Sequence, residues 1–98
     1  MELPEGYTKF DAADLLNTEE DIAAFLAICA EDNDPELMAH ALGAAARARG
    51  MTGVAKKTGL TRAALYQALS KDGNPTLSTL MKVLSALGLQ LKVVPTKA

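Results

Sequence analysis

The sequence predicts an all-α domain of five to six helices, followed by a short C-terminal β-strand. Apolar residues recur at helical spacing along most of the chain, which is the pattern of helices that bury one face. Most of these stretches follow a residue type that caps helix N-termini, either Asp or Thr. Because the chain has 98 residues, it suits one compact domain and has too little apolar surface for a second core.

Two helices are expected in the acidic first third of the chain. Asp11 caps a short one, with Asp14 at its third position. Phe10 and Leu15 flank this start as a hydrophobic staple. Thr18 begins the next helix, and acidic residues fill its first turn, where the helix dipole favours negative charge. The apolar residues that recur along it are Ile22, Phe25, Leu26 and Cys29.

The third helix is expected from residue 35 to about residue 49. Asp34 caps it, and the following proline takes its first position, where the missing N–H costs nothing. Arg47 and Arg49 favour the negative end of the helix dipole, and Gly50 ends the helix. Its buried residues are predicted to be Leu37, Ala41, Leu42 and Ala45.

Residues 51–70 have the spacing of a helix-turn-helix. Small Ala55 leaves room for the second helix to cross the first, and Gly59 provides the positive φ that ends the first helix. Leu60 follows as the buried residue of the turn, and Thr61 caps the second helix. Two short helices joined by a turn that contains glycine are the construction of a DNA-binding motif.

A loop of turn-forming residues follows at 71–75, and Thr76 then caps a last helix that Gly88 closes. The inward residues of this helix are predicted to be Leu77, Leu80, Met81, Leu84 and Leu87. Over residues 89–94 apolar and polar residues alternate with period two, which predicts a short strand. Since a single strand cannot satisfy its own backbone groups, it must pair with the N-terminal segment, a second copy or another protein.

Charge divides the chain into two segments of opposite sign. Residues 1–36 hold eleven of the twelve acidic residues and one of the ten basic residues, so their net charge is −10. The remaining residues hold one acidic and nine basic residues, so their net charge is +8. We therefore distinguish an acidic segment, 1–35, from a DNA-binding region with the strand, 36–98. The basic region can meet phosphates, whereas the acidic segment suits a basic protein or provides only solvated faces.

The second helix of the motif carries the predicted base-reading residues. In such motifs this helix enters the major groove while the first helix crosses the DNA backbone. Arg62 can donate two hydrogen bonds to guanine, and Gln67 can pair with adenine. Ala63 and Tyr66 share the exposed face; Ala63 suits a thymine methyl group, and Tyr66 suits a thymine methyl group or a phosphate. The alternative is that Arg62 and Gln67 are only solvated and that Tyr66 packs on the surface of the domain. Contacts with the DNA backbone are expected from Thr52, Lys56, Lys57, Thr61, Ser70, Lys71, Asn74 and Thr79.

Other classes of function find little support. Cys29 is the single cysteine and His40 the single histidine, so neither an internal disulfide nor a zinc site is expected. Because no paired nucleophile and base and no phosphate-binding glycine loop occur, we expect no enzyme activity, no cofactor and no small-molecule ligand. The chain has no apolar run of about 18 residues and no basic, apolar leader, which favours a cytoplasmic protein without membrane contact.

Several blocks of the sequence resemble one bacterial family. The blocks are residues 10–16, 21–26, 41–43, 46–51 and 72–77. In order they are Phe-Asp-Ala-Ala-Asp-Leu-Leu, Asp-Ile-Ala-Ala-Phe-Leu, Ala-Leu-Gly, Ala-Arg-Ala-Arg-Gly-Met and Asp-Gly-Asn-Pro-Thr-Leu. Together they resemble addiction-module antidote proteins, the HigA-like antitoxins of the Cro/C1-type helix-turn-helix superfamily, over residues 7–94.

The resemblance implies a lambda-repressor-like fold and a type II antitoxin that neutralises a small basic toxin of the RelE/ParE-like superfamily. It also implies a homodimer that binds double-stranded operator DNA and represses its own operon. Met51 departs from the pattern, since many such domains carry Gln there to support the recognition helix or a phosphate contact. Met cannot make these contacts, which leaves Thr52 as the substitute.

The segment that contacts the toxin has two candidates. Charge favours the acidic segment, with Phe10, Asp11, Asp14, Glu19 and Glu20 as contact residues. The apolar strand offers the other route, by strand addition to a partner sheet, or else it forms the homodimer. Two rival functions stay open: a stand-alone phage-type transcriptional regulator without a toxin partner, and an interaction module whose motif no longer binds DNA.

Overall fold

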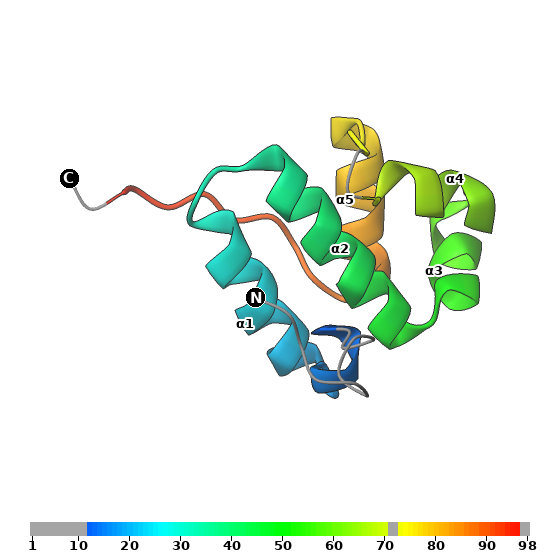
Figure 1. The fold of residues 1–98 in the computed structure, drawn as a ribbon, viewed down its shortest axis with the longest axis horizontal. Helices are drawn as coiled ribbons and strands as arrows, with labels where there is room; N and C mark the ends of the chain where they lie inside the picture. The colour runs from blue at the N-terminus through cyan, green and yellow to red at the C-terminus, as the bar shows by residue number, and fades with distance from the viewer. Residues whose placement is uncertain (1–11, 71–72, 97–98) are drawn as a thin grey trace, which may run out of the picture.

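A computed structural model of the chain describes residues 12–70 and 73–96. Its elements are the 3₁₀ helix η1 (Ala12–Leu15) and the α-helices α1 (Glu19–Ala30), α2 (Pro35–Arg49), α3 (Met51–Thr58), α4 (Arg62–Ala68) and α5 (Leu77–Ala86). In Figure 1, α2 runs through the middle of the fold, with α1 on one side and α3, α4 and α5 on the other. The prediction of an all-α fold is therefore confirmed for the described residues.

Side-chain caps begin α1, α2, α4 and α5 where the sequence predicts them. Thr18 Oγ1 accepts a hydrogen bond of 3.0 Å from the N–H of Asp21, whose carboxylate accepts one of 3.2 Å from the N–H of Thr18. This reciprocal pair is a complete capping box for α1. Asp34 caps α2 in front of its proline, and Thr61 and Thr76 cap α4 and α5 in the same way. Local hydrogen bonding thus determines where these helices start.

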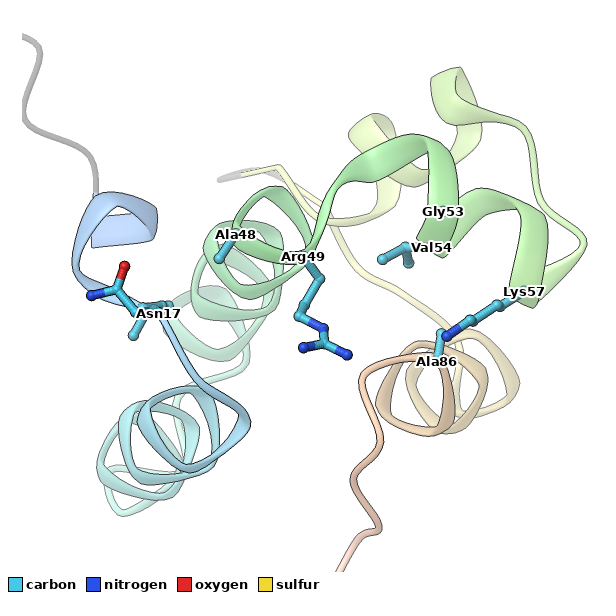
Figure 2. A pocket seen from close by; sticks show the side chains of 8 residues that line it. Asn17, Ala48, Arg49, Gly53, Val54, Lys57 and Ala86 are labelled. Carbon is cyan, nitrogen blue, oxygen red and sulfur yellow. The ribbon is translucent and has the colours of Figure 1, made fainter.

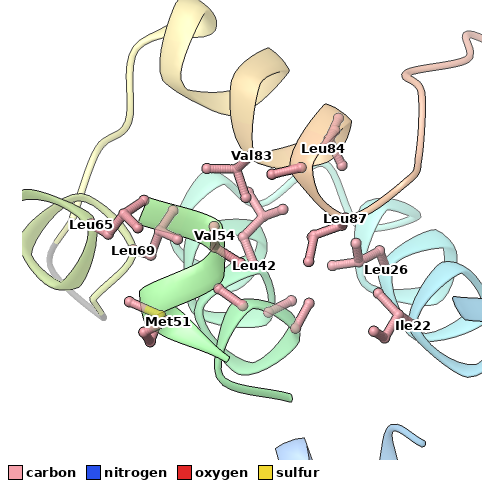
Figure 3. Packing of buried hydrophobic residues seen from close by; sticks show 14 of the residues in the cluster. Ile22, Leu26, Leu42, Met51, Val54, Leu65, Leu69, Val83, Leu84 and Leu87 are labelled. Atoms are coloured by element: carbon pink, nitrogen blue, oxygen red, sulfur yellow. The ribbon is translucent and has the colours of Figure 1, made fainter. Parts of the chain in front are cut away.

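One apolar cluster joins the helices (Figure 3). Its largest fully buried side chains are Ile22, Leu42, Leu65, Leu87 and Val83. They come from α1, α2, α4 and the end of α5, so the core links the acidic first third to the rest of the chain. Burial of each such side chain stabilises the fold by about 1.5–3 kcal/mol. Ala41 and Ala45 are buried as predicted, whereas Leu37 is only half-buried.

α5 buries a narrower face than the sequence predicts. Leu84 is buried and Leu80 is half-buried, but Leu77 is 68% exposed and Met81 is 47% exposed. The prediction is wrong for the last two residues, because α5 begins at the edge of the fold, where its first turns extend past the other helices (Figure 1). The buried face is centred instead on Val83 and Leu84, nearer the C-terminal end of the helix.

The strand predicted over residues 89–94 does not form. Beyond Gly88, whose φ is +79°, the chain runs past α1 and α2 without regular secondary structure (Figure 1). The N–H of Leu89 still donates to the carbonyl oxygen of Leu84 at 2.8 Å. The prediction is wrong for the single chain because no described segment pairs with this backbone, and an unpaired strand has no ladder to hold it.

The N-terminal predictions are tested only in part. Residues 12–15 form a 3₁₀ helix, on which the side chain of Asp14 is exposed. The cap at Asp11 and the staple at Phe10 lie outside the described residues, as does Lys71 in the loop before α5. Among the described helices, none is both long enough and apolar enough to cross a membrane.

Candidate nucleic-acid interface

The turn between α3 and α4 is closed by backbone and side-chain hydrogen bonds. Gly59 has a φ of +77°, and its N–H donates to the carbonyl oxygen of Ala55 at 2.9 Å, as expected for the end of α3. Thr58 is buried; its hydroxyl donates to the same oxygen at 3.1 Å and accepts from the N–H of Leu60 at 3.3 Å. This hydroxyl ties the end of α3 to the turn, a role that sequence analysis missed.

α4 is a short helix with clearly separated inner and outer faces. Leu65 is fully buried and Leu69, at the end of the helix, is 3% exposed, so both anchor α4 in the core (Figure 3). All the residues predicted to contact bases are on the outer face and exposed: Arg62, Ala63, Tyr66 and Gln67. The structure therefore brings these side chains together on one solvent-facing surface, which we call the outer face of α4.

Arg62 and Tyr66 contact each other on that face. The guanidinium carbon of Arg62 lies 5.8 Å from the centre of the Tyr66 ring, within the range of a cation–π contact. At an exposed site such a contact contributes about 0.5–1 kcal/mol. It holds the Arg62 side chain beside the tyrosine one helical turn away.

Two hollows flank α4. On one side Gln67 lines a hollow of about 330 Å³ together with Gly73 and Asn74 from the loop before α5. On the other side Tyr66 lines a hollow of about 240 Å³ with His40 and Arg47 of α2, among other residues. Asn74, a predicted contact with the DNA backbone, thus lies beside the predicted base-reading residue Gln67.

The hydroxyl groups predicted to bind phosphate differ in whether their hydrogen is already used in a hydrogen bond within the protein. Ser70 donates its hydrogen to the carbonyl oxygen of Gln67 at 3.0 Å, and phosphate oxygens only accept, so Ser70 is poorly suited to this role. Thr61 accepts from the N–H of Ala64 at 3.0 Å and keeps its own hydrogen. Thr79 accepts from the hydroxyl of Thr76 at 3.1 Å and likewise keeps a donor.

The adjacent lysines of α3 lie on different sides of the helix. Lys56 is exposed on the same side as Thr52, four residues earlier. Lys57 instead lines a pocket of about 230 Å³ with Arg49 of α2 and Ala86 of α5, among others (Figure 2). No residue of α4 lines this pocket. Lys56 and Thr52 are therefore better placed than Lys57 to share a surface with the outer face of α4.

Two glycines that sequence analysis did not interpret hold the end of α4. A Cβ atom at Gly43, inside α2, would lie 2.5 Å from the carbonyl oxygen of Leu69. A Cβ atom at Gly73 would collide with the carbonyl oxygen of Ala68. The helix-interior position of Gly43 was the available signal, because glycine costs about 1 kcal/mol there relative to alanine and needs a reason.

The residues predicted to contact a toxin are only partly described. Asp14, Glu19 and Glu20 are exposed, whereas Phe10 and Asp11 lie outside the described residues. A carboxylate oxygen of Glu19 lies 3.6 Å from a guanidinium nitrogen of Arg49, and both side chains are well exposed. Such surface ion pairs contribute at most about 1 kcal/mol, so Glu19 is tied to α2 only weakly.

Cys29 and His40 are the remaining residues considered for catalysis or metal binding. Burial, and to a lesser extent the charge of Asp32, raises the pKa of the Cys29 thiol above its ordinary value of 9.0, so the thiol is protonated at neutral pH. His40 is exposed on α2. In the described part of the chain, no group of His, Cys, Asp and Glu residues could hold a metal ion.

Comparisons with known proteins cover nearly the whole chain. A family model described as "Probable addiction module antidote protein" matches residues 6–95. A protein of Haemophilus influenzae, named only "Uncharacterized protein", is 44% identical over 91 residues, which are 93% of this chain and 94% of the relative. No solved structure matches the chain. The range matched by the family model includes residues 6–35 of the acidic segment and the helices around the outer face of α4.

Proposed function

Because the chain belongs to the family of probable addiction module antidote proteins, we propose that it neutralises a toxin by direct binding and represses its own operon. An addiction module pairs a toxin with its antidote, so membership of the family implies a toxin partner. We assign the chain to the HigA-like antitoxins and its partner to the small basic RelE/ParE-like toxins. The net charge of −10 over residues 1–36 supports a basic partner.

The DNA-binding half of the proposal rests above all on the outer face of α4. We interpret α3, the turn and α4 as a Cro/C1-type helix-turn-helix within a lambda-repressor-like fold. In that arrangement α4 enters the major groove, where Arg62 pairs with guanine and Gln67 with adenine. Ala63 and Tyr66 contact thymine methyl groups. The DNA backbone is contacted by Thr52, Lys56, Thr61, Asn74 and Thr79, with Lys57, Lys71 and Ser70 in lesser roles.

The assembly follows from the same mode of DNA binding. A single α4 covers only a few base pairs, so we propose a homodimer on a palindromic operator with half-sites about 34–36 Å apart. Residues 36–98 bind DNA, and residues 1–35 contribute to toxin binding. The protein works in the cytoplasm, where the operon is, and its role needs neither enzymatic activity nor a cofactor.

The test uses the full chain and the product of the toxin gene next to it. Co-expression is expected to restore growth, and the two proteins are expected to co-purify. A mobility-shift assay is expected to show binding to the DNA upstream of the operon. An Arg62→Ala/Gln67→Ala variant is the matched control, since it loses the shift but still restores growth.

The possible failures of this test differ from one another. A chain that binds the operator but neither binds nor neutralises its neighbour is a stand-alone regulator. A chain that restores growth without binding the upstream DNA is a protein-interaction module. Either result contradicts the corresponding half of the proposal.

A further inference from the structure

The two segments that the sequence offers as alternative toxin contacts line one groove. α1 provides Ala23, Ala27 and Ala30, and the opposite wall is formed by residues 89–92 of the C-terminal segment. Met38, from the start of α2, is also among the lining residues. The groove has a volume of about 200 Å³ and a mostly apolar lining. We call residues 89–96 the tail and the groove the α1–tail groove.

Large apolar side chains next to this groove are exposed to solvent in the single chain. Leu91 is 49% exposed, and Val93 and Val94, which follow it, are 88% and 65% exposed. Among the described residues, no backbone hydrogen bond joins residues 90–94 to another segment. The tail therefore presents apolar side chains and free backbone positions together, as a surface for strand addition needs.

Acidic residues border one end of the groove. The turn that joins α1 to α2 lies between the lining residues Ala30 and Met38, and its carboxylates are all exposed: Glu31, Asp32 and Asp34. No Lys or Arg occurs between residues 12 and 46. Lys92 is the single charged residue that lines the groove itself. An apolar floor with an acidic border fits a partner that presents an apolar side chain among basic ones.

We propose that the α1–tail groove is the docking surface for the toxin, a basic protein that inserts an apolar side chain between α1 and the tail. The partner's extended backbone pairs with residues 90–94, and its cations face the turn between α1 and α2. The proposal rests on the antidote function proposed above. It combines the two segments into one site instead of choosing between them.

A second copy of this chain fits the groove less well than a basic partner. A symmetric contact would gather the acidic turns of both copies around one interface, and Lys92 is the single charged lining residue of the groove that could offset them.

The test compares two lysine substitutions in α1 of the full chain. Ala27→Lys places a cation and a long side chain in the groove, whereas Ala24→Lys places the same side chain on an exposed part of α1 outside it. The probe is the toxin encoded by the neighbouring gene, titrated by calorimetry. We expect Ala27→Lys to weaken binding by at least about tenfold and Ala24→Lys to leave it nearly unchanged. Both variants are expected to bind operator DNA as the wild type does, which shows that they fold.

Two further variants test the other wall and the acidic border. Truncation after Gln90 removes the exposed tail and is expected to weaken toxin binding as strongly as Ala27→Lys. Glu31→Gln/Asp32→Asn is expected to slow association and to reduce its dependence on salt, since the removed charges act at long range.

The outcomes separate this inference from the function on which it rests. If wild-type chain does not bind the toxin, the antidote function itself is wrong. If wild-type chain binds it and Ala27→Lys and the truncation bind it equally well, the docking surface is wrong and the function stands. If Ala27→Lys instead abolishes self-association in light scattering at unchanged toxin affinity, the groove joins two copies and the proposal is wrong.

Discussion

Gly43 lies inside α2 against the carbonyl group of Leu69, and a methyl group there would come within 2.5 Å of that oxygen. We expect Gly43→Ala to lower the free energy of unfolding by about 1–3 kcal/mol, because the end of α4 must move away from α2. Urea denaturation measures this loss. Operator affinity is expected to fall as well, since the same movement displaces the outer face of α4.

Gly53 provides the matched control for this prediction. It also lies inside a helix, α3, but a Cβ atom there meets nothing within 4 Å. Gly53→Ala is therefore expected to raise the free energy of unfolding by up to about 1 kcal/mol, the gain in helix propensity. If both substitutions stabilise the protein, the close approach of α2 and α4 does not require glycine at position 43.

At the level of base recognition, Arg62 and Lys56 are expected to behave differently. Arg62→Ala should cost about 1–3 kcal/mol in operator binding and relax the preference at one base position. Lys56→Ala should weaken binding uniformly across sequences and reduce the salt dependence by about one counterion. Competition assays with single-base operator variants at two salt concentrations measure both effects. A uniform loss for Arg62→Ala would make it a backbone contact.

At the scale of elements, α4 depends on its surroundings because it has seven residues, too few for a helix that is stable alone. Its order comes from the Thr61 cap and from the burial of Leu65. We expect Thr61→Ala to cost about 0.5–2 kcal/mol of stability and to weaken operator binding, because the first turn of α4 carries Arg62 and Ala63. Thermal unfolding and a mobility-shift assay measure the two effects.

The corresponding cap of α1 tests whether that effect is local. Thr18 caps α1 with the same type of hydrogen bond, at a helix that does not contact the proposed DNA surface. Thr18→Ala is expected to lower stability by a similar amount and to leave operator affinity unchanged in folded protein. Equal losses of operator affinity in both variants would mean that general stability, not the start of α4, limits DNA binding.

For the whole molecule, the two proposed binding surfaces are separated in space as well as in charge. α4 and α1, which forms one wall of the α1–tail groove, lie on opposite sides of α2 (Figure 1). We therefore expect the complex of antidote and toxin to bind the operator and to migrate more slowly than the antidote alone in a mobility-shift assay. Release of DNA on addition of toxin would show that the surfaces overlap or that the toxin disrupts the dimer.

Local features of the sequence determined the helices and their starts. The caps at Thr18, Asp34, Thr61 and Thr76 and the positive φ of Gly59 depend on groups within four residues of each other, so they follow from short stretches of chain. The exposed outer face of α4 follows in the same way, because the helical period separates it from Leu65 and Leu69. The opposite charges of the two segments are likewise a property of the sequence alone.

Only the tertiary structure decided which surfaces lack a neighbour and which segments meet. Leu77 and residues 90–94 have the pattern of buried elements, but burial needs a partner surface, which their position at the edge of the fold does not provide. The role of Gly43 depends on Leu69, which is distant in sequence, and the α1–tail groove joins segments about sixty residues apart. Sequence periodicity specifies a face of an element, whereas packing of the whole chain specifies what that face contacts.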